Sequence, residues 1–227
     1  GCAAWFGAGG WAPLLIACAL PLAAVGLLDD QLNLSSLWRY GVQLLTAGAL
    51  LMISPLFKGW IPSVPLLFFG VVAVLLLVTV TAVINFTNFM DGLDGLVASC
   101  MTVAFCTASL YLREAFGLWI LVGSLLGFLL WNWSPAKVFM GDVGSVPLGF
   151  LLGWLLLDMA GNGYWTVAII LPAYYLADST FTLIRRALKG EKVWQAHRQH
   201  FYQQAVQRGL SHGQVTIMVA FLGAFLV

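Results

Sequence analysis

The sequence predicts an all-α protein, a polytopic bundle of transmembrane helices forming one integral membrane domain. Of its 227 residues, 61% are hydrophobic and only 8% are charged, and the mean hydropathy is +0.94. The apolar residues form long blocks separated by short polar stretches, as in membrane proteins built from several spanning helices. The blocks lack a strict apolar–polar alternation, so helices are predicted rather than strands. A soluble domain is excluded by this composition.

The apolar blocks predict about eight spanning helices. Seven lie at 11–28, 38–54, 64–84, 96–112, 116–133, 146–160 and 164–184, and an eighth begins near residue 214. Blocks of about 20 apolar residues match the thickness of the hydrocarbon core. The chain begins at Gly1 and ends inside an apolar run. We therefore expect residues 1–227 to be a fragment, truncated at both ends.

The polar connections alternate between two sides, and the basic residues distinguish these sides. One side carries Arg39, Lys137, Arg185, Arg186, Lys189, Lys192, Arg198 and Arg208. The other side carries only Lys58 and Arg113. Because cytoplasmic loops are enriched in Lys and Arg, the first side is predicted to face the cytoplasm. Five aspartates share that side: Asp29, Asp30, Asp91, Asp94 and Asp142.

The segment NFTNFMDGLDGL, residues 85–96, is unusually polar for a sequence that directly follows a spanning block. Asp91 and Asp94 are three residues apart, so they would point the same way if a helix started here. Gly92 and Gly95 leave room for a ligand to approach the backbone. Polar groups concentrated at the end of a spanning helix are costly unless they bind something. The segment therefore predicts a binding site.

The acidic face predicts a site for a hard cation and a phosphorylated ligand. Mg²⁺ prefers carboxylate and phosphate oxygens and is commonly held by one or two protein carboxylates together with the substrate; Mn²⁺ is a possible substitute. Lys and Arg would neutralise charge that the metal leaves unbalanced. The cysteines lie in apolar segments without metal-ligand spacing, so zinc or copper is not predicted. They are Cys2, Cys18, Cys100 and Cys106.

Each part of this arrangement also has a purely structural interpretation. Asp29 and Asp30 can be solvated or can cap the following helix. Asp142, in the GDVGS turn, can be the N-cap of a helix that begins at Val146. A histidine in the polar loop after residue 188 can be an unspecialised surface residue. The basic residues of that loop can act only as determinants of topology.

Four segments in a fixed order carry a family resemblance. They are DD at 29–30, NFTNFMDGLDGL at 85–96, PAKVFMGDVGS at 135–145, and Asp178 followed by RRALKGE and a histidine-containing loop. Over roughly residues 20–215 the chain resembles the polyprenyl-phosphate N-acetylhexosamine-1-phosphate transferases of the glycosyltransferase family 4 type, and most resembles the O-antigen-initiating subgroup.

The resemblance implies transfer of N-acetylhexosamine-1-phosphate from a UDP-N-acetylhexosamine to polyprenyl (undecaprenyl) phosphate, with Mg²⁺ bound. The products would be a polyprenyl-diphospho-sugar and UMP, in the first membrane step of O-antigen or another cell-envelope glycan. It further implies a multi-pass protein of the bacterial inner (cytoplasmic) membrane, with its active site facing the cytoplasm. The expected partners are the two substrates and the lipid bilayer; a homodimer is possible, and nucleic acid is not expected.

The resemblance also assigns candidate roles to individual residues. Asp142 matches the principal Mg²⁺ ligand. The catalytic candidates are Asp29, Asp30, Asp91 and Asp94, of which Asp29 would accept the proton of the lipid phosphate or assist the metal. The substrate-binding candidates are Asn88, Arg39, Lys137, His200 and Arg198.

The histidine loop departs from the family pattern. Many relatives have an Asp followed three residues later by H-x-H-H, whereas this chain reads HRQHFYQ over 197–203. Only His200 aligns with a family histidine, and Tyr202 and Gln203 occupy the other two histidine positions. We therefore expect different contacts to the sugar or the diphosphate.

Two other classes of protein compete with this hypothesis. A transporter of ions or of a phosphorylated solute would place ionisable residues near the middle of the membrane, and Asp178 is the plausible intramembrane carboxylate. A membrane metallopeptidase is suggested by His197 and His200. Their spacing is H-x-x-H, without the glutamate of an H-E-x-x-H site.

Overall fold

The computed structural model describes residues 11–60, 65–112, 116–193, 195 and 197–226, and this part of the chain is helical without strands. Its helices are α1 (Trp11–Leu32), α2 (Ser36–Ile53), α3 (Pro55–Trp60), α4 (Leu66–Phe89), α5 (Leu96–Tyr111), α6 (Phe116–Asn132), α7 (Gly141–Gly161), α8 (Trp165–Ile170), α9 (Ala173–Leu188), α10 (Phe201–Gln207) and α11 (His212–Phe225). The predicted all-α membrane bundle is confirmed. Cys2, Val64 and Arg113 lie outside the described residues.

Three helices among the described residues are long and apolar enough to cross a membrane. They are Pro13–Leu32 within α1, α4 and α7. The helices α5, α6 and α11 are apolar but shorter. Leu66 and Leu67 at the start of α4 are more than 80% exposed, as is expected of side chains that face lipid rather than protein.

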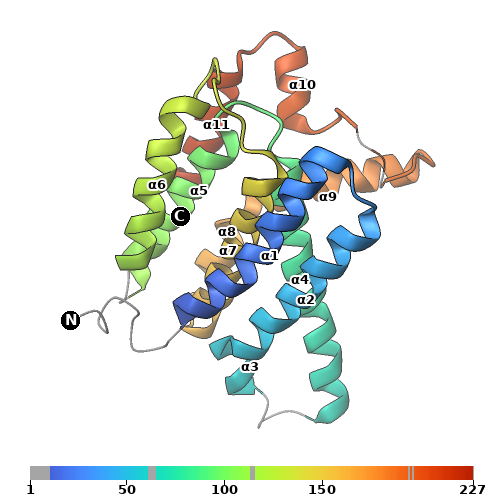
Figure 1. Ribbon diagram of the computed structural model, residues 1–227, viewed down its shortest axis with the longest axis vertical. Coiled ribbons are helices and arrows are strands. Elements are labelled where there is room, and N and C mark those ends of the chain that lie inside the picture. Colours follow the sequence, from blue (N-terminus) through green and yellow to red (C-terminus); the bar gives the residue numbers. More distant parts are fainter. Residues whose placement is uncertain (1–10, 61–64, 113–115, 194, 196, 227) are drawn as a thin grey trace.

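The polar connections gather at one end of the bundle. Figure 1 shows the segments that follow α1, α4, α6 and α9 at the upper end, whereas α3 and the beginning of α4 lie at the lower end. This arrangement matches the alternation predicted from the sequence. It brings four motifs that are distant in sequence to the same end of the molecule.

Several helix boundaries differ from the sequence prediction in ways that matter for the site. The predicted span 164–184 is broken into α8 and α9 around Leu171 and Pro172, because proline lacks the N–H that would continue the helix. The helix α4 continues five residues past Ile84, to Phe89. The helix α7 begins at Gly141 rather than Val146, which places the GDVGS motif in its first turn. The short helices α3 and α10 were not predicted.

Helix α7 is the centre of the bundle. Within its apolar stretch 56% of the residues are buried, against 17% for α4 and 22% for α1. Glycines allow the close packing. A Cβ added at Gly149 would lie 2.8 Å from the Cα of Ile84 on α4, and one added at Gly26 of α1 would lie 2.5 Å from the carbonyl oxygen of Asp142. Small residues at helix contacts are how membrane helices approach each other closely.

We expect Gly149→Ala to lower the stability of the extracted protein by about 1–3 kcal/mol, because the methyl group meets the rigid backbone of α4. A thermal-unfolding assay in detergent measures the effect. Gly123→Ala on α6 is the matched control, since a Cβ at Gly123 meets no atom within 4 Å. Equal melting temperatures for the two variants would contradict this account of the α4–α7 contact.

Candidate functional site

A cavity of about 640 Å³ opens between α1, α2, α4, α7 and the described residues of the loop after α9, among them Gln195 and His197. Its apolar part is lined by residues such as Leu22, Leu44 and Val78. Its polar part includes Arg39, Asn88, Asp142, His197, His200 and Gln203. A ligand with a long hydrocarbon part and a charged head group matches this division of the lining.

The first turn of α7 is capped by a carboxylate from α1. The Oδ1 atom of Asp30 accepts a hydrogen bond from the backbone N–H of Asp142 at 3.1 Å, and Oδ2 accepts one from Val143 at 3.2 Å. Gly141 provides the left-handed backbone (φ 64°) that starts the helix. The N-cap residue Met140 makes no side-chain capping bond. The interpretation of Asp142 as the N-cap is therefore wrong: Asp30 caps α7 across the bundle.

Asp142 is surrounded by polar groups from three helices. Asn88 Nδ2 donates to Asp142 Oδ1 at 2.7 Å and also to Ser145 Oγ at 2.9 Å. Arg39 Nη1 lies 2.8 Å from Asp29 Oδ2 and 3.8 Å from Asp142 Oδ2. Asn88 reaches this position because α4 continues into the motif.

Asp91 belongs to the same acidic group, although it lies in the turn after α4. Burial, the neighbouring charge of Asp142 and the charge of Asp30 raise the pKa of Asp91 to about 7, while a hydrogen bond from the backbone of Gly141 opposes the rise. The carboxylates here are close enough to repel one another. A bound cation would relieve that repulsion, and carboxylate oxygens are the donors that Mg²⁺ prefers.

Asp94 occupies a different position. Its Oδ2 accepts a hydrogen bond from the backbone N–H of Ala136 at 3.2 Å, and its Oδ1 lies 3.3 Å from His212 Nδ1 on α11. Its carbonyl oxygen accepts from Thr216 at 2.9 Å. Because α5 begins only at Leu96, the expectation that Asp91 and Asp94 share a helical face is wrong. Asp94 joins the turn to α11 and to the segment before α7.

Lys137 and Arg198 lie outside the cavity lining. The Nζ atom of Lys137 lies 5.6 Å from the ring centroid of Trp131. Arg198 is exposed, and its carbonyl oxygen accepts from Gln207 at 3.0 Å. The arrangement of the chain does not bring these two candidates together with Arg39 and Asp142.

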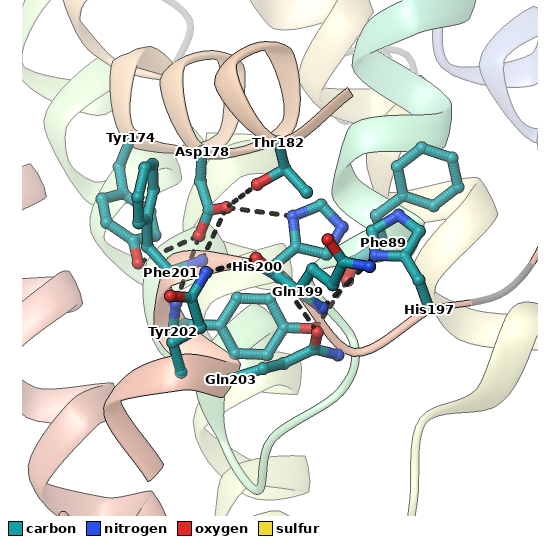
Figure 2. Close-up of polar contacts among 11 residues, drawn as sticks. Phe89, Tyr174, Asp178, Thr182, His197, Gln199, His200, Phe201, Tyr202 and Gln203 are labelled. Atoms are coloured by element: carbon teal, nitrogen blue, oxygen red, sulfur yellow. Dashed lines mark hydrogen bonds and ion pairs between the residues drawn. The ribbon is translucent and has the colours of Figure 1, made fainter. Parts of the chain in front are cut away.

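His200 is buried rather than a surface residue, with only 3% of its side chain exposed. Its Nδ1 atom lies 2.9 Å from Asp178 Oδ1 on α9, a contact that Figure 2 shows among several donors around that carboxylate. Tyr202, at a family histidine position, donates from its hydroxyl to the carbonyl oxygen of Phe89 at 2.7 Å. Gln203 accepts from the backbone N–H of His200 at 3.2 Å. The sequence analysis did not select Asp178 as a site residue.

The sequence analysis also did not predict that Arg186 binds the loop after α9. Only 5% of its side chain is exposed, and its Nε atom lies 2.9 Å from Glu191 Oε2. Its guanidinium donates to the carbonyl oxygens of Lys192 at 3.0 Å and Gln195 at 3.1 Å. Its role is therefore more than topological. It holds the segment that carries His197 against the cavity; burial, Arg186 and His200 lower the pKa of His197.

A partly buried amide pair continues the polar lining of the cavity. Asn85 Nδ2 donates to Gln43 Oε1 at 2.7 Å, and Gln43 is 5% exposed. Both residues line the cavity. The only sequence signal for Gln43 is that it is a polar residue inside the apolar block 38–54.

The chain belongs to glycosyl transferase family 4, whose family model matches residues 12–160. A Bacillus subtilis relative, "Probable undecaprenyl-phosphate N-acetylglucosaminyl 1-phosphate transferase", is 31% identical over an alignment of 223 positions, which covers 92% of this chain and 62% of the relative. "Undecaprenyl-phosphate alpha-N-acetylglucosaminyl 1-phosphate transferase" of Yersinia pestis is 30% identical over an alignment of 235 positions, which covers 94% of this chain and 63% of the relative. "Decaprenyl-phosphate N-acetylglucosaminephosphotransferase" of Mycobacterium leprae is 28% identical over an alignment of 243 positions, which covers 91% of this chain and 61% of the relative.

These comparisons confirm the family predicted from the motifs, and the relatives come from bacteria. The chain spans about three fifths of the length of these curated relatives. The three relatives are named as transferases, so they give no support to the transporter hypothesis. Their names do not mention O-antigen, and the subgroup stays a prediction.

The raised pKa of Asp91 predicts how stability depends on pH in the absence of divalent metal. The folded state holds this proton up to about pH 7, whereas an unfolded aspartate releases it near the model value of 3.8. Between about pH 4 and about pH 7 the unfolded state loses this proton while the folded state keeps it. The free energy of unfolding therefore falls across this range. We expect Asp91→Asn to match the wild type near pH 4 and to be more stable at pH 7.

Thermal unfolding in detergent with a chelator, measured across this pH range, tests the expectation. The expectation would be contradicted if the difference in melting temperature between the wild type and Asp91→Asn were the same at pH 4 and at pH 7.

Proposed function

We propose that the full-length protein transfers N-acetylhexosamine-1-phosphate from a UDP-sugar to polyprenyl phosphate and releases UMP. The observation that carries the proposal is a connected polar group, in which Arg39, Asn88 and Asp142 line the cavity and contact or adjoin Asp29, Asp30 and Asp91. The names of the curated relatives support the same reaction. We further propose that this end of the bundle faces the cytoplasm, because the basic residues are concentrated there.

In this reaction an oxygen of the lipid phosphate forms a bond to the β-phosphorus of the UDP-sugar. The bond between that phosphorus and the bridging oxygen breaks, and UMP leaves with the electron pair. Phosphoryl transfer depends mainly on positioning and on stabilising charge. Much of a phosphate monoester is already doubly ionised at neutral pH, since its second pKa is about 6. Asp29 would therefore mainly orient the nucleophile.

The polar residues divide this work between them. Arg39 is 40% exposed and is close to both Asp29 and Asp142, so its guanidinium is available to phosphate oxygens. Asn88 fixes the orientation of the Asp142 carboxylate through a 2.7 Å hydrogen bond. Asp30 acts indirectly: it caps α7 and thereby sets the position of Asp142. The apolar part of the cavity lining would hold the first isoprene units.

The acidic group fits a divalent cation. Among the described residues no group of three or more His, Cys, Asp or Glu side chains forms a complete metal site. Mg²⁺ is usually bound by only one or two protein carboxylates, and substrate phosphates supply further ligands. We propose Asp142 as the principal ligand, with Asp29 beside it and Mn²⁺ as a substitute metal. When bound, the cation would supply charge stabilisation for the diphosphate.

We expect Asp142→Asn to reduce UMP release by at least about 100-fold, because a neutral amide neither holds the cation nor balances its charge. Membranes containing the full-length protein would be given polyprenyl phosphate, Mg²⁺ and a panel of UDP-N-acetylhexosamines. Asp158→Asn, on the same helix but at its other end, is the matched control and should retain wild-type release.

Robust UMP release by folded Asp142→Asn protein would refute the assignment of the metal ligand. Failure of the wild-type protein to release UMP with every donor would refute the proposed function. Release that requires one donor of the panel would identify the sugar.

A further inference from the structure

Asp178 is a buried carboxylate surrounded by hydrogen-bond donors. Its side chain is 1% exposed. Its donors are Tyr174 Oη at 3.3 Å, Thr182 Oγ1 at 3.2 Å, His200 Nδ1 at 2.9 Å, and the backbone N–H groups of Phe201 at 3.0 Å and Tyr202 at 3.3 Å. A buried carboxylate that accepts this many bonds is well suited to remain ionised.

The contact with Asp178 determines the tautomer of His200. An ionised carboxylate only accepts hydrogen bonds, so the proton of the imidazole lies on Nδ1. The other nitrogen, Nε2, lies on the far side of the ring from Asp178, on the side where Figure 2 shows His197. His200 is one of the residues that line the cavity. Nε2 is therefore the ring nitrogen that does not contact Asp178.

Three rings hold the imidazole of His200 in place. The ring of Tyr202 stacks on it with centroids 5.7 Å apart, the ring of His197 lies at 4.8 Å, and that of Phe89 lies at 6.1 Å. Phe89 directly follows Asn88, whose amide orients Asp142. The hydroxyl of Tyr202 is bonded to the carbonyl oxygen of Phe89. The histidine is thus fixed relative to the acidic group by contacts that pass through α4.

The charged and titratable groups around Asp178, His197 and Tyr202 come from α9, α10, the loop between them and the turn after α4, which contributes Asp91. The others are Asp178 and Tyr174 on α9, Arg186 near the end of α9, Glu191 and His197 in the loop, and Tyr202 on α10. His197 has a lowered pKa and accepts a hydrogen bond at Nδ1 from the backbone N–H of Gln199, at 3.4 Å. Asp178 is the carboxylate in direct contact with His200.

We infer that Asp178 is a positioning residue, which holds the Nδ1 proton of His200 and directs Nε2 into the cavity to contact the UDP-sugar. This inference rests on the proposed function. A carboxylate behind a histidine fixes both the tautomer and the orientation of the ring. It also stabilises the positive charge when Nε2 is protonated beside a phosphate oxygen.

Asp178 could instead have a purely structural role, namely to hold the start of α10 against α9. The same carboxylate accepts from the first N–H groups of this seven-residue helix. If docking of α10 were the whole function, replacement of Asp178 would harm the protein whether or not His200 is present. The two roles therefore differ in how the substitutions combine.

The test is a double-mutant cycle in the full-length protein, with Asp178→Asn, His200→Ala and the double variant. UMP release gives kcat and KM for the UDP-sugar and for polyprenyl phosphate. Ser179→Ala is the matched control, because the buried hydroxyl of this neighbour on α9 has no hydrogen-bond partner among the described residues. If His200→Ala does not fold, His200→Gln takes its place in the cycle.

We expect Asp178→Asn to lower kcat/KM for the UDP-sugar by about 10- to 100-fold, the size of a hydrogen bond to a charged group. The KM for polyprenyl phosphate should stay unchanged, and Ser179→Ala should behave as the wild type. In the His200→Ala background the further change should be less than about twofold. An equal loss in both backgrounds would overturn the inference in favour of α10 docking.

A second measurement is independent of turnover. Imidazole ¹⁵N NMR of protein labelled at histidine should report the Nδ1–H tautomer for His200 in the wild type and a mixture of tautomers in Asp178→Asn. A mixed or Nε2–H tautomer in the wild type would overturn the inference. If wild-type protein released no UMP yet showed the Nδ1–H tautomer, the proposed function would fail while the positioning by Asp178 remained.

Discussion

The capping of α7 by Asp30 is the contact on which the polar end of the bundle depends. It joins the last turn of α1 to the first turn of α7, the most buried of the three long apolar helices. Carboxylate capping satisfies backbone N–H groups in the first turn of α7, which have no partner within their own helix. Gly26 and Gly141 allow the approach, since a Cβ at either position would meet the opposite segment within 2.7 Å. The position of Asp142 follows from this junction.

Two groups of polar contacts lie at this end of the bundle, an acidic layer and a second layer. The acidic layer contains Asp142, its partner Asn88, and Asp29 with Arg39. The second layer is the loop after α9, in which Arg186 binds backbone carbonyl oxygens and Asp178 binds His200. The hydroxyl of Tyr202 joins the two layers at the end of α4. In this chain a tyrosine at a family histidine position therefore has a definite structural role.

Residues predicted to act together from their spacing separate into different roles in the fold. Asp91 faces Asp142 and Gly141, whereas Asp94 faces α11 and the segment before α7. Spacing along the sequence misled here because the polypeptide turns at Asp91–Gly95 before α5 begins. Asp29 and Asp30 diverge as well, since one binds Arg39 and the other caps α7. The roles of Asp178 and Arg186 were not predicted, because both side chains bind residues of the segment after α9. The position of that segment cannot be derived from spacing along the sequence.

The sequence by itself determined the class of fold, the alternation of the polar segments and the family. Hydrophobic block length, charge distribution and motif order are properties of the chain that do not require contacts between helices. It also identified Asp142, Asn88 and Arg39, which the fold brings within hydrogen-bond or ion-pair distance of the same acidic group. Only the tertiary structure decided which carboxylate caps a helix, which lines the cavity and which nitrogen of His200 contacts Asp178, because those properties depend on groups up to 113 residues apart.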